Sequence, residues 1–247
     1  MTVAAANGRT AMPEPTVIAR LSHAAGLNLD GYRAEHVDER IRRALVREDV
    51  ADPVALVRLI ASDAAARSRF RRSIAVSVSG LFRDPAQFEH LEHDVLPGLV
   101  AGGRRVSVWS AGCADGSELY SVALILERFA ALERSVLLGS DLLSENLVRA
   151  RAGEYPGQSI SPTVRGRVRW EQRDLLGDGA APGRWRLVVC RNVAIYFSRP
   201  ARQRLYDTLA GALAPGGVLL LGRTERLARP ETHGLEPIAP HTYRRLA

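Results

Sequence analysis

The sequence predicts an α/β fold in which a mostly parallel sheet carries helices on both faces, preceded by a small helical domain. From about residue 105 onward, short apolar runs alternate with amphipathic helical patterns, as in a parallel sheet with crossover helices. Between residues 13 and 76 only helical periodicity occurs. The predicted divisions are a disordered terminus (1–12), a helical domain (13–76), a connecting segment with one helix (77–104) and the sheet domain (105–247).

The first part of the chain contains four predicted helices. Apolar residues recur at helical spacing, and Asp52-Pro53 is a start signal because an aspartate cap precedes a proline in the first turn. Residues 1–12 are small and polar without periodicity, which is typical of disorder. The predicted helices cover residues 13–25, 31–47, 53 onward and 63–76.

The second part is predicted to alternate strands and helices after one leading helix. A helix over 87–96 is followed by a loop over 97–103. The further elements are strand 105–111, helix 117–132, strand 135–141, helix 143–152, strands 166–173 and 186–191, helix 199–213 and strand 217–222. Residues 235–238 and 243–246 are predicted to add an antiparallel pair at one edge of the sheet.

One stretch, residues 106–121, predicts a ligand site. A strand-like run breaks at Gly112 and Gly116 and continues as a helix, so that a ligand can approach bare backbone N–H groups. About twenty-five residues later, Asp141 ends the next strand, where a carboxylate accepts hydrogen bonds from ribose hydroxyls. The spacing matches neither a dinucleotide fingerprint nor a phosphate-binding loop, so S-adenosylmethionine is favoured over NAD or ATP. The alternative is that the glycines only turn the chain.

Composition excludes several classes of protein and leaves others open. The net charge is +7, and every basic residue is arginine. The runs 40–43 and 67–72 would attract an acidic partner or phosphates, or simply form solvated helix faces. No apolar run reaches the roughly 20 residues that cross a membrane and the start lacks a leader pattern, so we expect a cytoplasmic protein without membrane insertion. Cys113 and Cys190 follow no metal or disulfide spacing and are expected to be buried packing residues; no metal site is predicted.

Four sequence blocks resemble the CheR-type family of chemotaxis-receptor methyltransferases. The blocks are residues 77–84, 109–121, 139–141 with 150–155, and the most specific, C-R-N-V-A-I-Y-F at 190–197. The resemblance covers nearly the whole chain. It implies a Rossmann-like methyltransferase fold and transfer of a methyl group from S-adenosylmethionine to glutamate side chains of chemoreceptors, leaving S-adenosylhomocysteine.

The resemblance also implies roles for individual residues. Arg83 would hold the acceptor carboxylate with two hydrogen bonds, and Tyr196 would lie beside the transferred methyl group. Asp141 would bind ribose, Glu118 would face the methionine ammonium group, and Asp174 with Leu175 would contact adenine. The full set of expected cofactor-binding residues is Ser77, Ser79, Arg83, Ala111, Gly112, Glu118, Asp141, Asp174, Leu175, Arg191 and Asn192. Structural alternatives are a strand-end cap for Asp174 and a favourable helix-end charge for Glu118.

The sequence departs from the family pattern in four places, three altered blocks and one shortened segment. Serines replace the usual N-x-T before Arg83, the block 116–121 lacks a glutamate and a proline, and the G-x-S-E-N block reads Gly222 to Arg226 with arginine last. Between residues 155 and 168 only a dozen residues remain, too few for the family's three-stranded subdomain. We therefore expect a peptide-independent enzyme whose substrate recognition uses Arg40, Arg42 and Arg43.

The expected partner is the cytoplasmic region of a chemoreceptor or a similar acidic coiled-coil protein, and a monomer is favoured. Two alternatives stay open at this point. One is a methyltransferase on the same scaffold with another acceptor, because fold alone does not fix the acceptor. The other is a regulatory protein that binds S-adenosylmethionine without transferring the methyl group. A nucleic-acid methyltransferase is disfavoured, because the basic residues have no interleaved aromatics for base stacking.

Overall fold

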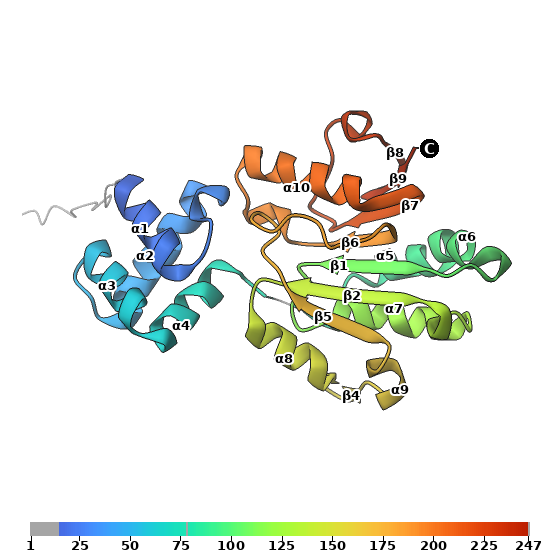
Figure 1. The fold of residues 1–247 in the computed structure, drawn as a ribbon, viewed down its shortest axis with the longest axis horizontal. Helices are drawn as coiled ribbons and strands as arrows, with labels where there is room; N and C mark the ends of the chain where they lie inside the picture. Colours follow the sequence, from blue (N-terminus) through green and yellow to red (C-terminus); the bar gives the residue numbers. More distant parts are fainter. Residues whose placement is uncertain (1–14, 78, 247) are drawn as a thin grey trace, which may run out of the picture. The chain divides into compact units, whose positions relative to one another are not determined.

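The computed structural model describes residues 15–77 and 79–246 (Figure 1). The chain divides into two compact units, Met1–Ile74 and Ala75–Ala247. Disorder was predicted for residues 1–12, which lie outside the described residues.

The first unit is helical, as the periodicity predicts. Its elements are α1 (Pro15–Ala25), the 3-10 turn η1 (Leu29–Gly31), α2 (Ala34–Glu48), α3 (Pro53–Ser62) and α4 (Ala64–Ile74). Asp52 caps α3, because its Oδ1 accepts a hydrogen bond from the Ala55 N–H at 2.8 Å. The core consists of fully buried apolar side chains from all four helices, among them Leu21, Ile41, Leu56, Ile60 and Phe70.

An ion-pair cluster joins the end of α2 to α4. The Glu48 side chain is 7% exposed, and it accepts hydrogen bonds from Arg69 at 2.6 Å and Arg47 at 2.8 Å. The hydrogen bond from Arg69, with that from Arg47 and the charges of both, lowers the pKa of Glu48 from 4.5 to about 2.

This lowered pKa predicts a pH dependence of stability. Between pH 4.5 and about 2 Glu48 is protonated in the unfolded chain but not in the folded chain. The contribution of Glu48 to the free energy of unfolding is therefore fully present above pH 4.5 and is lost as the pH falls through that window. We expect the thermal transition of the helical unit to fall less steeply in Glu48→Gln than in the wild type between these values. Calorimetry of the full chain at several pH values measures this, and parallel curves for the two proteins would contradict it.

The second unit contains the sheet. Its strands are β1 (Ser107–Ala111), β2 (Val136–Asp141), β3 (Glu154–Tyr155), β4 (Gln158–Ser159), β5 (Val168–Gln172), β6 (Trp185–Cys190), β7 (Leu213–Leu221), β8 (Leu235–Ala239) and β9 (Thr242–Arg245). Its longer helices are α5 (Pro85–His90), α6 (Leu96–Val100), α7 (Ser117–Arg128), α8 (Ser144–Ala152), α9 (Pro162–Arg165) and α10 (Arg199–Ala212). The short helical segments are the π-helical η2 (Leu91–Val95) and the 3-10 turns η3 (Ala101–Gly103), η4 (Leu132–Arg134), η5 (Ala194–Tyr196) and η6 (Pro230–His233).

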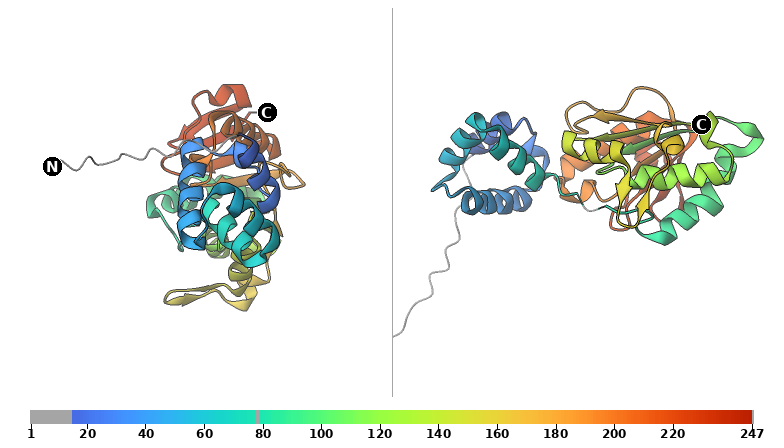
Figure 2. Two further views of the ribbon diagram at one scale, coloured as in Figure 1. Left: turned by 90° about the vertical axis from the view of Figure 1, so that its left-hand side faces the viewer. Right: turned by 90° about the horizontal axis from the view of Figure 1, so that it is seen from below.

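The seven-stranded sheet has the order β5-β2-β1-β6-β7-β9-β8 (Figure 1). The first five strands in this order are parallel, and β9 pairs antiparallel with both β7 and β8. From β1 the chain moves through α7 to β2 on one side, and from β6 through α10 to β7 on the other. Because such crossovers are right-handed, α7 and α10 cover opposite faces (Figure 2). The predicted fold class and the antiparallel closing pair are confirmed.

Two segments differ from the sequence prediction. The helical region predicted to end at residue 96 continues through α6 to Val100, and the loop predicted from 97 is wrong in its first part. Pro97 lies in the first turn of α6, where its missing N–H costs no helical hydrogen bond. The second difference is the strand pair β3–β4 with α9, which the sequence did not predict; both strands have two residues, below the length at which periodicity is visible.

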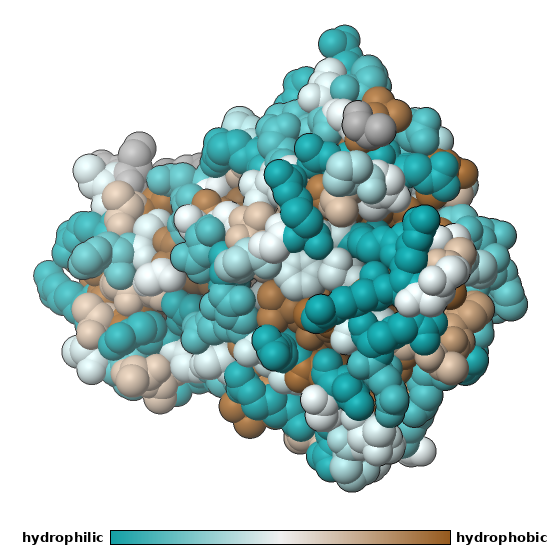
Figure 3. Space-filling view, turned by 45° about the vertical axis from the view of Figure 1, so that its right-hand side comes forward, coloured by the Kyte–Doolittle hydropathy of each residue, from teal (hydrophilic) through white to brown (hydrophobic). Residues whose placement is uncertain are grey.

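The core of this unit surrounds the sheet. Side chains of α5, η2 and α6, including Phe88, Leu91 and Leu96, pack with β1, β6 and α7 in one apolar cluster. Cys113 and Cys190 are buried free thiols whose pKa values are raised by burial, which confirms them as packing residues. Hydrophilic side chains predominate on the face seen in Figure 3.

Candidate active site

Five parallel strands end at one edge of the sheet, and the predicted site residues lie at or after the ends of β1, β2, β5 and β6. Strands β1 and β6 are neighbours, but their crossovers run in opposite directions, so a crevice opens between their carboxyl ends. A pocket lies there. It is lined by Ser79, Gly80, Arg83, Gly112, Cys113, Ala114, Ser117, Glu118, Arg191 and Asn192. Six of these ten residues belong to the set predicted from sequence.

Gly112 allows two loops to meet at this crevice. Its φ is +78°, and a Cβ at this position would lie 2.6 Å from Cγ2 of Val193. Its N–H donates to the Ser140 carbonyl at 2.8 Å, which ties the loop after β1 to the end of β2. A side chain here would therefore collide with the Val193 side chain and force it to move. Ala111, the last residue of β1, is fully buried beneath this turn.

Asp141 lies at the end of β2 and is 8% exposed. Its Oδ1 accepts hydrogen bonds from the Leu143 N–H and from Asn146 Nδ2, and its Oδ2 accepts one from the Ala114 N–H, all at 2.9 Å. Burial raises the pKa of this carboxyl, while the three donors oppose the shift. With three of about four acceptor positions used by described residues, Asp141 retains room for one ribose hydroxyl.

Glu118 and Arg191 form a buried pair across the crevice. Glu118 Oε1 accepts from Ser110 Oγ at 2.8 Å, and Oε2 accepts from Arg191 Nη1 at 3.4 Å. Burial raises the pKa of Glu118, and the Arg191 charge opposes this. A ligand ammonium group beside Glu118 would favour the carboxylate in the same way.

The Arg191 side chain, 3% exposed, holds the segment that carries Arg83. Its Nη2 donates to the Arg83 carbonyl and to Asp84 Oδ2, both at 2.8 Å, and its Nε donates to Gln87 Oε1 at 2.9 Å. Its guanidinium also lies 5.0 Å from the centre of the Phe88 ring. Arg191 therefore acts through the backbone of the Arg83 loop rather than as a free cation.

Glu225 holds the loop after β6. The carboxylate, in a residue 3% exposed, accepts from four backbone N–H groups: those of Asn192 (2.6 Å), Val193 (3.0 Å), Ala194 (2.7 Å) and Gly222 (2.9 Å). Consecutive N–H groups that point at one anion form a backbone nest. A Cβ at Gly222 would lie 2.6 Å from Glu225 Oε2, so glycine is required for this approach.

Other predicted residues lie outside the pocket lining. Ser77 accepts a hydrogen bond from Asn146 Nδ2 at 2.9 Å and thereby neighbours Asp141. Asp174 accepts from the Leu176 N–H at 2.9 Å as a strand-end cap, with Leu175 buried beside it. Tyr196 is half-buried on η5, four residues after Asn192. The adenine and catalytic roles given to these residues stay predictions.

The arginines predicted to recognise substrate lie on α2 of the first unit. Arg42 is paired with Asp38 at 3.1 Å and with Glu39 at 2.9 Å, and Glu39 also pairs with Arg43. Arg40 is half-buried, and its Nε has no hydrogen-bond partner among the described residues. Because carboxylates of the same helix neutralise part of this charge, α2 attracts an acidic partner less strongly than its arginine count indicates.

Sequence reasoning missed three residues that build the site. Glu225 accepts from backbone N–H groups 31 to 33 positions away, Gln87 accepts from Arg191 104 positions away, and Asn146 donates to Asp141. For Glu225 the sequence did offer a signal. It is an acidic residue shortly after an apolar strand, and a charge buried at such a position needs a hydrogen-bond or ion-pair partner.

Comparison with known proteins decides the family. The model of the "CheR methyltransferase, SAM binding domain" matches residues 77–164 and 156–242. The chain belongs to the CheR methyltransferase family. The two matched pieces overlap at 156–164.

Curated relatives agree with this membership. A chemotaxis protein methyltransferase of Listeria monocytogenes is 32% identical and covers 85% of this chain and 88% of its own length. Chemotaxis protein methyltransferase 1 of Pseudomonas aeruginosa is 34% identical over 62% of this chain and 67% of its own. A probable chemotaxis protein methyltransferase of Rhizobium etli is 29% identical over 89% and 94%.

The CheR chain is an S-adenosylmethionine-dependent methyltransferase, and the predicted family, cofactor, enzyme class and role in chemotaxis signalling are confirmed. The residues around the crevice fit this cofactor. Asp141, nearly buried and with one acceptor position left, suits a ribose hydroxyl, and the Glu118 carboxylate in the pocket lining suits an ammonium group. No described helix has the length and apolarity that crossing a bilayer requires.

Proposed function

We propose that this CheR protein methylates glutamate side chains in the cytoplasmic region of a chemoreceptor, or of a similar acidic coiled-coil protein. The observation that supports this most strongly is the 191–194 loop. Glu225 holds its backbone and Arg191 holds the Arg83 segment, so the two parts of the chain expected to orient an acceptor are fixed beside one pocket.

The chemistry requires orientation and exclusion of water more than proton transfer. S-adenosylmethionine, when bound, supplies a methyl carbon whose bond to sulfur breaks, with the electron pair left on sulfur, as an acceptor oxygen forms the new bond. A glutamate carboxylate is already ionised at neutral pH, so the protein needs no general base. Rate enhancement then comes from alignment of the two reacting atoms.

Arg83 is the residue suited to align the acceptor. Its side chain is exposed at the rim of the pocket, while its carbonyl is fixed by the bond from Arg191. A planar guanidinium binds a carboxylate with two parallel hydrogen bonds, which sets both its distance and its plane. Tyr196 would pack beside the methyl group from the far side of the same loop.

Recognition of the acceptor does not use a peptide-binding subdomain in this proposal. Residues 154–165 form only β3, β4 and the four-residue α9. Two strands of two residues offer no free edge long enough for strand addition. The acceptor must therefore be recognised by the helical unit or by the surface next to the pocket.

A methyl-transfer assay tests the proposal. We expect radiolabelled methyl groups from S-adenosylmethionine to enter a receptor cytoplasmic fragment and to be released as methanol at alkaline pH, because carboxyl esters hydrolyse there and N-methyl groups do not. Arg83→Ala should lower kcat/KM by about 100-fold or more, since lost alignment costs this much. Base-stable label would indicate another acceptor. No transfer by a protein that binds S-adenosylmethionine would indicate a regulatory binding protein and overturn the proposal.

A further inference from the structure

A second hollow lies between α10 and the segment 226–233. It is lined by Arg199, Arg202, Gln203, Tyr206, Arg226, Leu227, Ala228, Arg229, Thr232 and His233. Four of the ten residues are arginines and none is acidic. The floor is ordered, because the His233 side chain is 3% exposed and its Nδ1 lies 2.7 Å from Asp207 Oδ1.

The four arginines are not neutralised by neighbours. Among the residues that the structure describes, no carboxylate is within ion-pair distance of any of them, in contrast to Arg42 and Arg43 on α2. Asp207, the acid that contacts the lining, is engaged with His233. Like charges held together around a concavity raise the local potential and attract anions.

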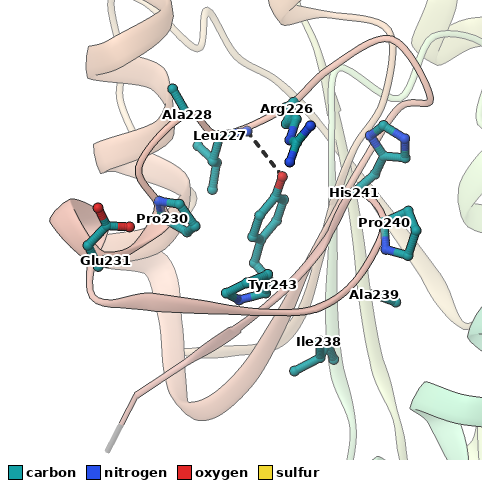
Figure 4. A pocket seen from close by; sticks show the side chains of 11 residues that line it. Arg226, Leu227, Ala228, Pro230, Glu231, Ile238, Ala239, Pro240, His241 and Tyr243 are labelled. Atoms are coloured by element: carbon teal, nitrogen blue, oxygen red, sulfur yellow. Dashed lines mark hydrogen bonds between the residues drawn. The ribbon is translucent and has the colours of Figure 1, made fainter.

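The wall that carries Arg226 and Arg229 is held from behind. Figure 4 shows its other side, where the Leu227 N–H donates to Tyr243 Oη at 3.1 Å. One residue before Arg226, the Glu225 carbonyl lies 2.6 Å from His241 Nδ1. The backbone on both sides of Arg226 is therefore fixed while its side chain is exposed, so binding an anion orders little additional chain.

The hollow is close to the expected reaction centre. Arg199 follows Tyr196 by three residues, so their Cα atoms are at most about 11 Å apart. Arg226 directly follows Glu225, whose carboxylate holds the loop that lines the cofactor pocket. On an α-helix, residues four and seven positions from a given residue lie about 6 and 10.5 Å from it along the axis. These distances are similar to the separation between Tyr196 and Arg199.

We propose that this arginine hollow binds acidic side chains of the acceptor protein that lie one to two helical turns from the methylated glutamate. The inference rests on the proposed function, since it takes a glutamate on an acidic helix as the acceptor. Several carboxylates spaced along one helix match several arginines around one concavity, and arginine forms paired hydrogen bonds with each. Selection of the methylation site would then depend on the acidity of its flanks.

The test uses two synthetic helical peptides of about four heptads. Both contain one acceptor glutamate; in the first, the residues four and seven positions away are glutamate, and in the second they are glutamine. Fluorescence anisotropy measures binding to the full chain loaded with S-adenosylhomocysteine. We expect the acid-flanked peptide to bind the wild type at least tenfold more tightly. The double variant Arg202→Glu/Arg229→Glu should lose this preference.

Arg204→Glu is the matched control, because Arg204 is an exposed residue of the same helix that does not line the hollow. It should keep the preference. Equal binding of both peptides by the wild type, or equal loss in Arg204→Glu, would overturn the inference. The two proposals can fail independently. If the acid-flanked peptide binds more tightly but no base-labile methyl ester forms, the proposed function is wrong. If both peptides are methylated equally well, the hollow has no role in selecting the site.

Discussion

Glu225→Gln is expected to cause a large loss of both stability and activity. Each Glu225 oxygen accepts from two backbone N–H groups. In glutamine one oxygen becomes an NH2 group, which would face two donors, and the charge is lost. Hydrogen bonds to a buried charge contribute roughly 1.5–3 kcal/mol each, so losing two or more should cost on the order of 3 kcal/mol or more.

Calorimetry and enzyme kinetics measure this result. For a unit of this size a loss of about 3 kcal/mol lowers Tm by roughly 6–12 °C. The loop 192–194 should shift, and a displacement of even about 1 Å at reacting groups lowers kcat/KM by about 100-fold. Glu236→Gln is the control, because that carboxylate is 47% exposed and pairs with Arg244 only at 3.7 Å. Wild-type stability in Glu225→Gln would show that the four N–H groups need no anion.

Arg191→Met is expected to cause a loss of stability of similar size, with a different effect on the pocket. Methionine fills part of the volume but removes the bonds to the Arg83 carbonyl, Asp84 and Gln87, and leaves Glu118 without its buried partner. Breaking a buried pair by removing one partner costs about 3–5 kcal/mol. The pKa of Glu118 should rise further, since the Arg191 charge now opposes the effect of burial.

The matched variant is Arg186→Met, at the start of β6, the strand that ends one residue before Arg191. Arg186 donates to the Leu99 carbonyl at 2.8 Å, and its strand position is far from the carboxyl edge. We expect both variants to lose stability, but only Arg191→Met to bind S-adenosylhomocysteine at least tenfold more weakly and to expose residues 79–84 to hydrogen exchange. Equal affinity of the two variants for S-adenosylhomocysteine would mean that Arg191 stabilises the fold without influencing the pocket.

The order of strands and helices could be predicted because it depends on local periodicity. Apolar runs such as 187–190 and 218–221 are buried on both faces of the sheet, and such continuous apolar runs predict strands. Pro97 and the strand pair β3–β4 were missed for local reasons as well: a proline in a first turn resembles a helix stop, and two-residue strands have no period.

The candidate site could be predicted only in part. Gly112 and Asp141 follow strand ends, so topology alone brings them to one edge of the sheet. The bond from Arg191 to Gln87 joins residues 104 positions apart, and no pattern within either segment specifies it. The pairing of Arg42 and Arg43 with Asp38 and Glu39, by contrast, follows from their spacing of four residues and was predictable from the helix.

Calorimetric titration with S-adenosylmethionine and S-adenosylhomocysteine tests most directly whether the crevice between β1, β2 and β6 holds the cofactor. We predict that the wild type binds both ligands and that Asp141→Ala weakens binding at least about 30-fold, which corresponds to about 2 kcal/mol. Asp94→Ala, which removes a 66% exposed carboxylate on η2, should bind as the wild type does. Unchanged affinity in a folded Asp141→Ala protein would contradict this placement of the cofactor.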